Sequence, residues 1–171
     1  MITTKRGDRG ETSLYDGTRV NKDDARIELN GELDELNAML GLCKAVTQQL
    51  EPYEQIQKEL MIVMGIVANG YQARSDADAL TRALHTLLVA IDRMEAYIKR
   101  ETEGKKFNFV MPGRNLPDAA LHLARTKTRT CERRLVTLSH LEGADKQQEE
   151  WTVLKKYLNR LSDYLFCLCN R

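Results

Sequence analysis

The stretch from Thr4 to Ser13, TKRGDRGETS, combines the residue types that bind phosphate groups in proteins. Gly7 and Gly10 allow the backbone to approach an anion closely, and nearby hydroxyl and cationic side chains can donate to its oxygens. The hydroxyl donors are Thr4, Thr12 and Ser13, and the cations are Lys5, Arg6 and, further along, Lys22. The stretch lacks the GxxxxGK[ST] pattern of a P-loop. A segment without apolar residues is also typical of a disordered terminus, so composition alone leaves both interpretations open.

A second group of polar side chains follows helical spacing. His122, Arg125, Arg129 and Glu132, here called the charged row, recur every three or four residues beside an apolar seam. Two arginines one turn apart present forked donors that suit phosphate oxygens, and Glu132 could hold a ribose hydroxyl or an arginine. The alternative is that RTKTRTCERR is an ordinary solvated helix face with intrahelical ion pairs.

Apolar residues at helical spacing predict five helices that position these groups. Asp23 and Asp24 are cap candidates for the first helix, and Ser75 and Asp76 for the third. We find no convincing strand alternation, so we predict an all-α fold: a five-helix up-and-down bundle in one domain, residues 1–171, with an irregular N-terminal arm, residues 1–22. The periodic segments are Leu29 to Cys43, Glu54 to Arg74, Leu80 to Ile98, Leu121 to Leu138 and Trp151 to Leu168.

One connection is long enough to suggest a function. The segment TEGKKFNFVMPGRNLPD, residues 102–118, interrupts the helical pattern with Gly104, Pro112, Gly113 and Pro117. Binding and catalytic residues are often carried on such connections.

Composition excludes several classes of protein. With 26 basic and 25 acidic residues the net charge is only +1, which disfavours binding to nucleic acid or to a membrane surface. The longest apolar run, Leu60 to Ala68, is about half as long as a membrane span. Nothing at the start resembles a signal peptide, so we expect a reduced, cytoplasmic protein. The cysteines show no disulfide framework, and their spacing argues against a zinc site; they are Cys43, Cys131, Cys167 and Cys169.

Four segments, in this order, resemble the ATP:cob(I)alamin adenosyltransferases of the type used in propanediol utilisation and in the human cobalamin pathway. Together they cover roughly half of the chain, while residues 50–100 resemble the family mainly in helical pattern. The segments are TKRGDRGETSLYDGTRVNKDD, GELDELNAMLG, FNFVMPGRNLPDAALHLARTKTRTCERR and YLNRLSDYLF.

This resemblance implies a homotrimer of five-helix bundles, with ATP held between adjacent subunits and the corrinoid above it. The implied reaction transfers the 5′-deoxyadenosyl group of ATP to the cobalt of cob(I)alamin and releases triphosphate. Mg²⁺ would accompany ATP, bound chiefly by its phosphates rather than by protein side chains. A reductase is a further partner that the resemblance suggests. Because cob(I)alamin is itself a strong nucleophile, the protein would need to position the reactants and stabilise the departing triphosphate.

Matching positions assign roles to individual residues. The resemblance implies catalytic roles for Arg125, Arg129, Asp34 and Phe109. Asp34 matches an acid that pairs with Arg125 across the subunit interface, and Phe109 matches the aromatic that replaces the lower cobalt ligand beneath the corrin. A core aromatic on a loop is the alternative for Phe109. The implied ATP-binding residues are Thr4, Lys5, Arg6, Gly7, Thr12, Ser13 and Lys22 from the arm, and Arg125, Arg129, Glu132, Arg133 and Asn159 from the bundle.

Two positions depart from the family pattern. Arg114 stands where the family usually has the second glycine of Pro-Gly-Gly, and Thr130 stands where it has a second arginine. The connection after Leu138 also looks several residues longer than usual. The departures motivate one alternative, a catalytically inactive cobalamin or ATP carrier or sensor on the same trimeric bundle. A structural helical protein without a small ligand is a second alternative, and nucleic-acid binding is disfavoured by the balanced charge.

Overall fold

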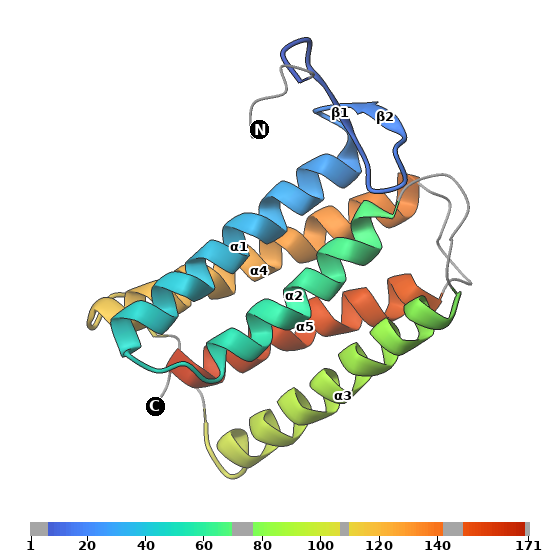
Figure 1. The fold of residues 1–171 in the computed structure, drawn as a ribbon. Helices are drawn as coiled ribbons and strands as arrows, with labels where there is room; N and C mark the ends of the chain where they lie inside the picture. Colours follow the sequence, from blue (N-terminus) through green and yellow to red (C-terminus); the bar gives the residue numbers. More distant parts are fainter. Residues whose placement is uncertain (1–6, 70–76, 107–109, 142–148, 170–171) are drawn as a thin grey trace.

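The computed structural model describes residues 7–69, 77–106, 110–141 and 149–169. These residues form a small hairpin followed by five long helices that alternate in direction (Figure 1). The predicted all-α bundle is therefore confirmed. The elements are β1 (Glu11–Ser13), β2 (Arg19–Asn21), α1 (Ala25–Thr47), α2 (Tyr53–Ala68), α3 (Ala77–Thr102), α4 (Leu116–Leu141) and α5 (Glu149–Cys169).

The core lies between the predicted apolar seams. α1 packs mainly against α4 and α2, and α5 packs mainly against α4 and α3. Burying each leucine of these seams stabilises the fold by about 2 kcal/mol relative to exposing it. Among the described helices, none is both long and apolar enough to cross a membrane. The fully buried seam leucines include Leu29, Leu33, Leu36 and Leu40 of α1 and Leu154, Leu158, Leu161 and Leu165 of α5.

A buried carboxylate joins three of the helices. Glu59 of α2 pairs with Arg93 of α3, with 2.8 Å between Oε1 and Nη1, and Oε2 accepts a 3.0 Å hydrogen bond from the Tyr157 hydroxyl of α5. Burial raises the pKa of Tyr157 well above its usual value, so the hydroxyl keeps its proton and donates to Glu59. A buried charge requires such partners, and losing one would leave the other unsatisfied.

The N-terminal arm corrects one prediction, because part of it is regular. β1 and β2 pair antiparallel, with Thr12 opposite Val20. The turn between them contains Asp16 and Gly17, and the Asp16 carboxylate accepts a 2.9 Å hydrogen bond from the Thr18 N–H. Gly17 has φ +86°, a conformation that side chains disfavour. Asp-Gly is a hairpin signal, but strands of three residues are too short to show alternation in the sequence.

The second helix ends at Ala68, earlier than the predicted Arg74. Its last carbonyl groups have partners outside the helix. The Ala68 carbonyl accepts a 3.1 Å hydrogen bond from the Tyr15 N–H of the hairpin loop, and the Val67 carbonyl accepts a 2.8 Å bond from Arg26 Nη1. These contacts replace the next helical turn and anchor the hairpin to the bundle. The predicted caps Ser75 and Asp76 lie outside the described residues, whereas Asp24 is confirmed as the cap of α1.

The fourth helix begins at Leu116, five residues before the predicted Leu121. Asn115 caps it, since its side-chain oxygen accepts a 2.9 Å hydrogen bond from the Asp118 N–H. Pro117 therefore lies in the first turn, where a missing N–H costs nothing because first-turn N–H groups have no partner within the helix. Treating Pro117 as a helix breaker was the error.

The four cysteines are buried and free. Burial raises the pKa of the thiols, to about 12 for Cys43 and Cys131 and to about 11 for Cys169, so they remain protonated and unreactive at neutral pH. In the described ranges no group of three His, Cys, Asp or Glu side chains is placed to hold a metal ion.

Candidate functional site

The arm brings together two of its predicted phosphate-binding residues. The Gly10 N–H donates to the Gly7 carbonyl at 3.3 Å, and the Lys22 N–H donates to the Gly10 carbonyl at 2.8 Å. This turn places the Lys22 side chain against Gly7, where an added Cβ would lie 3.2 Å from Nζ. A glycine backbone beside an ammonium group is an arrangement that can receive a phosphate oxygen. Thr4, Lys5 and Arg6 lie outside the described residues.

The two hydroxyl residues of β1 lie on opposite faces of the hairpin. Ser13 is exposed and its Oγ accepts a 3.3 Å hydrogen bond from Arg19 Nη1, whereas Thr12 is half-buried. Side chains alternate along a strand, so neighbouring residues cannot both face one ligand through their side chains. Arg19 also pairs with Glu11 at 3.0 Å, and sequence reasoning did not single out this arginine.

The charged row exists on α4 but changes in exposure along its length. His122 is buried, Arg125 is half-buried, and the Arg129 side chain is 52% exposed. Glu132 is oriented from α5, because its Oε1 accepts a 2.9 Å hydrogen bond from Asn159 Nδ2. The structure thus brings together Glu132 and Asn159, two predicted ATP-binding residues. Arg129 Nη1 lies 4.0 Å from Glu132 Oε2, at the limit of an ion pair.

Thr130, one of the two departures, makes a local contact. Its hydroxyl accepts a 3.0 Å hydrogen bond from Arg133 Nη2, and Arg133 is exposed. Arg133, another predicted ATP-binding residue, is therefore held along the surface of α4. An arginine at position 130 would remove this acceptor, because guanidinium groups only donate hydrogen bonds.

Asp34 is exposed on α1 beside a set of ion pairs that fixes the register of α1 on α4. Lys127 pairs with both Glu32 and Glu35, and Arg134 pairs with Glu28 at 3.4 Å. Lys127 keeps its charge, since these carboxylates raise its pKa against the opposing effect of burial. Lys127 therefore serves the packing of α1 on α4.

The predicted partner of Asp34, Arg125, points to its own helix instead. Arg125 Nε donates to His122 Nδ1 at 3.2 Å. In the described part of the chain no ion pair joins Asp34 to Arg125. The pairing predicted across a subunit interface stays a prediction.

The described part of the arm, residues 7–22, makes no hydrogen bond or ion pair with the charged row of the same chain. The hairpin projects from the end of the bundle at which α1 begins (Figure 1). Arg134 lies level with Glu28 near that end. Arg129 lies five residues earlier in α4, about 7.5 Å further from that end along the helix axis. Among the described residues, the row makes hydrogen bonds and ion pairs within α4 and with Asn159, and none with the hairpin.

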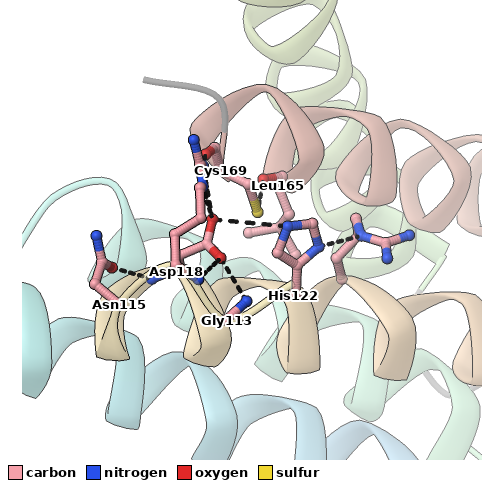
Figure 2. A network of polar contacts seen from close by, with 8 residues as sticks. Gly113, Asn115, Asp118, His122, Leu165 and Cys169 are labelled. Carbon is pink, nitrogen blue, oxygen red and sulfur yellow. Dashed lines mark hydrogen bonds and ion pairs between the residues drawn. The ribbon is translucent and has the colours of Figure 1, made fainter. Parts of the chain in front are cut away.

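A polar network that sequence reasoning missed lies at the opposite end of α4, where the connection before this helix meets the end of α5 (Figure 2). Asp118 accepts hydrogen bonds from the Gly113 N–H at 2.8 Å and the Arg114 N–H at 3.1 Å, and from Arg114 Nε at 3.0 Å and Nη2 at 2.6 Å. Arg114 Nη2 also donates to the Cys169 carbonyl. The Arg114 contacts and the two backbone donors hold the pKa of Asp118 down, at about 2, against the effect of burial. The spacing of Arg114 and Asp118, four residues apart, was the available signal.

His122 continues this network toward Arg125. Its Nε2 lies 3.8 Å from Asp118 Oδ1, and its Nδ1 accepts from Arg125. Burial lowers the pKa of His122, and the positive charge of Arg125 lowers it further, so the ring is neutral at pH 7. Because Nδ1 accepts a hydrogen bond, the proton is assigned to Nε2, which faces the Asp118 carboxylate.

Comparisons with known proteins agree with this architecture. A family model described as Cobalamin adenosyltransferase matches residues 2–171. A corrinoid adenosyltransferase of Citrobacter freundii is 37% identical over 173 residues, which cover 98% of this chain and 92% of the relative. One from Bacillus subtilis is 36% identical, covering 96% of this chain and 82% of the relative. The chain spans about half, 48%, of the corrinoid adenosyltransferase PduO of Salmonella typhimurium, at 37% identity over 98% of this chain.

Solved structures show the same fold. A phenylalanine-to-histidine variant of a PduO-type ATP:corrinoid adenosyltransferase from Lactobacillus reuteri, complexed with cobalamin and ATP, matches with a TM-score of 0.76 at 28% identity, covering 99% of this chain and 89% of that chain. An arginine-to-lysine variant of the same type of enzyme, complexed with ATP, gives a TM-score of 0.73 at 29% identity, covering 99% and 92%.

Proposed function

Because the chain belongs to the cobalamin adenosyltransferase family, we propose that it transfers the 5′-deoxyadenosyl group of ATP to the cobalt of cob(I)alamin. The products are adenosylcobalamin and triphosphate. The observation that carries the proposal is the match of the family model to residues 2–171, which includes both the arm and the charged row.

The residues fit the chemistry of this reaction. The cobalt(I) electron pair forms the bond to C5′, the bond from C5′ to oxygen breaks, and triphosphate leaves with the electrons of that bond. The protein must align the two reactants and stabilise charge on the leaving group. We assign the second task to Arg125, Arg129 and Lys22. Glu132, oriented by Asn159 through Oε1, can accept from a ribose hydroxyl through Oε2, which lies 4.0 Å from Arg129 Nη1.

We place the complete site between subunits of a homotrimer. The arm of one subunit would meet the charged row of the next, because the described hairpin projects from the end of its own bundle and makes no described contact with its own row. The exposed carboxylate of Asp34 would then pair with Arg125 of a neighbouring subunit. Such a contact is heterologous, and three copies can close it into a ring.

Phe109 is assigned to the corrinoid side of the site, although it lies outside the described residues. The two Lactobacillus reuteri variants support this assignment. One variant replaces a phenylalanine and the other an arginine of that enzyme. The number of residues between these two positions equals the number between Phe109 and Arg129 in this chain. An apolar side chain in place of the lower cobalt ligand would favour the form of cob(II)alamin that is easier to reduce.

Mg²⁺, a reductase and a cytoplasmic location complete the proposal. Mg²⁺ would be held chiefly by the triphosphate oxygens, which suits a site whose described side chains are mostly cationic, and it would neutralise charge on the leaving group. A reductase would supply the electron that converts cob(II)alamin to cob(I)alamin. The four free thiols fit a reducing compartment such as the cytoplasm.

The two departures give no support to an inactive carrier. Arg114 is bound to Asp118 and to the end of α5, and Thr130 receives a hydrogen bond from Arg133. Neither replaces Arg125 or Arg129.

An anaerobic assay with chemically reduced cobalamin and Mg-ATP tests the proposal. We expect the absorbance of cob(I)alamin to be replaced by that of adenosylcobalamin. ATP binding without this conversion would contradict the proposal and favour a carrier or sensor.

A further inference from the structure

The Arg114 and Asp118 pair joins three parts of the molecule. It connects the end of the connection before α4, the first turn of α4 and the last residues of α5 (Figure 2). The contact to the Cys169 carbonyl satisfies one of the acceptors that a helix leaves unpaired at its C-terminus, where a cation is also favoured by the helix dipole. The chain around Arg114 is therefore fixed to α5 as well as to α4.

The pair is buried on its acidic side. The Asp118 side chain is 4% exposed, whereas that of Arg114 is 47% exposed. A buried carboxylate needs charged or multiple hydrogen-bond donors, and Asp118 receives four donor contacts. Those contacts hold the carboxylate in one orientation.

Capping of α4 does not explain Asp118. Asn115 already caps the helix through the Asp118 N–H, and the Asn115 carbonyl accepts from the Ala119 N–H at 3.0 Å. Two of the four donors to Asp118 are instead the N–H groups of Gly113 and Arg114, which precede the helix. Gly113 has φ +102°, a backbone conformation that glycine adopts readily and that other residues disfavour. The carboxylate acts on the connection rather than on its own helix.

The same carboxylate also faces the charged row. Its Oδ1 lies 3.8 Å from His122 Nε2, a buried nitrogen with no hydrogen-bond partner among the described residues. On the other side of the ring, His122 Nδ1 accepts a hydrogen bond from Arg125 Nε. Asp118 thus lies between the connection that carries Phe109 and the row that carries Arg125. Arg114, His122 and the Cys169 thiol are the charged or titratable groups that interact with Asp118 in this network, and Arg125 reaches it through His122.

We propose that Asp118 is a positioning residue that, together with Arg114, sets the geometry of the corrinoid side of the site. This inference rests on the proposed function, in which the connection before α4 contacts the corrinoid. The pair holds residues 113–118 against α4 and α5, and in this proposal that anchor fixes how the adjoining residues 110–112 are presented to the corrinoid. Arg114, a departure from the family pattern, has a role in this arrangement.

Two substitutions remove the charge pair with little change of shape. Asp118→Asn keeps an acceptor for the Gly113 and Arg114 N–H groups, and Arg114→Gln keeps a long polar side chain. Anaerobic calorimetry would measure the Kd of cob(II)alamin at saturating ATP and, separately, the Kd of ATP. We expect the Kd of cob(II)alamin to rise about tenfold in each variant, a size typical of a misplaced binding group. The Kd of ATP should stay within about twofold.

A double variant and a matched control separate this role from a structural one. If the two residues act as a pair, Asp118→Asn combined with Arg114→Gln should weaken cob(II)alamin binding no more than either change alone. Glu54→Gln is the control, because it breaks another ion pair at the same spacing, 3.1 Å from Lys58 on α2. It should leave both Kd values unchanged.

The outcomes are distinct. Cob(II)alamin binding within about twofold of the native protein in both single variants, or an equal loss of ATP affinity, would overturn the positioning role. A native protein that neither binds cob(II)alamin nor forms adenosylcobalamin would overturn the proposed function, and this inference with it.

Discussion

At the scale of single residues, a substitution of Arg129 should affect activity strongly and stability very little. Its side chain is half-exposed, and its described contact, to Glu132, is at the limit of an ion pair. We predict that Arg129→Ala lowers kcat/KM about 100-fold by removing a donor to the departing triphosphate. The free energy of unfolding should change by less than about 0.5 kcal/mol. Steady-state kinetics and urea denaturation would measure the two effects.

Arg134 provides the matched control for this prediction. It lies on the same helix, its side chain is 50% exposed against 52% for Arg129, and it pairs with Glu28. Arg134→Ala should leave kcat/KM within about twofold, since surface ion pairs contribute little. Equal losses of activity in the two variants would show that α4, rather than Arg129 itself, is the sensitive feature.

The lowered pKa of Asp118 predicts that the stability of the fold depends on pH. Its pKa is about 2 in the folded protein against an ordinary 3.8, so its stabilising effect is present above pH 4 and is lost as the pH falls through 2. The lowered pKa corresponds to about 2 kcal/mol. The native protein should therefore exceed Asp118→Asn in unfolding free energy at pH 7, and the difference should shrink between pH 4 and pH 2. Urea denaturation across this range would measure it, and a difference independent of pH would refute the ion pair.

The sequence predicted some residue pairs and not others. The family resemblance assigned Glu132 and Asn159 to one site, and the structure adds the hydrogen bond between them, which joins α4 and α5. The pair of Arg114 and Asp118 could not, because it depends on where the connection meets the end of α5. That meeting is a tertiary contact, and the sequence pattern contained only the spacing of four residues.

At the scale of elements, the turn before the hairpin brings Gly7 and Lys22 close together. Gly7→Ala would place a Cβ 3.2 Å from Lys22 Nζ and 3.3 Å from Cε, so the flexible end of the lysine would move. We predict that the KM of ATP rises about threefold to tenfold while the melting temperature stays unchanged, because a displaced donor affects binding and not the core. Steady-state kinetics at saturating cob(I)alamin would measure the effect.

Gly65→Ala is the control for that substitution. Gly65 lies on α2, and an added Cβ there meets nothing within 4 Å. This change should raise stability by up to about 1 kcal/mol through helix propensity and leave the KM of ATP unchanged. An unchanged KM in Gly7→Ala as well would argue against a phosphate site at this turn.

Helix interiors were predictable, and helix ends were not. The seams of α1, α4 and α5 repeat every three or four residues, which predicts their buried faces directly. The end of α2 was wrong because Tyr15 and Arg26 take its last carbonyl groups, and the start of α4 was wrong because Pro117 is tolerated in a first turn. Both errors come from local hydrogen bonds that apolar periodicity does not record.

At the scale of the whole molecule, a site shared between subunits can be tested by mixing defective chains. Lys22→Ala damages the arm and Arg129→Ala damages the row, and each homotrimer should have low activity. In mixed trimers, the intact row of the first variant can meet the intact arm of the second. Each mixed trimer has one intact site of three, so isolated mixed trimers should have about one third of the native activity and an unfractionated equal mixture about one quarter.

Trimers of proven mixed composition, isolated through two different tags, are required for that comparison. Activity no higher than the average of the two parents would place the arm and the row of one chain in the same site. Asp34→Asn, which removes the predicted partner of Arg125, should weaken the trimer in light-scattering measurements.

In the proposed reaction, the chain moves an adenosyl group from ATP to cobalt and releases intact triphosphate. The most direct test is a single-turnover reaction with Mg-ATP and cob(I)alamin in which both products are quantified, adenosylcobalamin by absorbance and the phosphate products by phosphorus NMR. We predict one triphosphate for each adenosylcobalamin formed. ADP and phosphate, or bound ATP with no cobalt-carbon bond formed, would contradict the account.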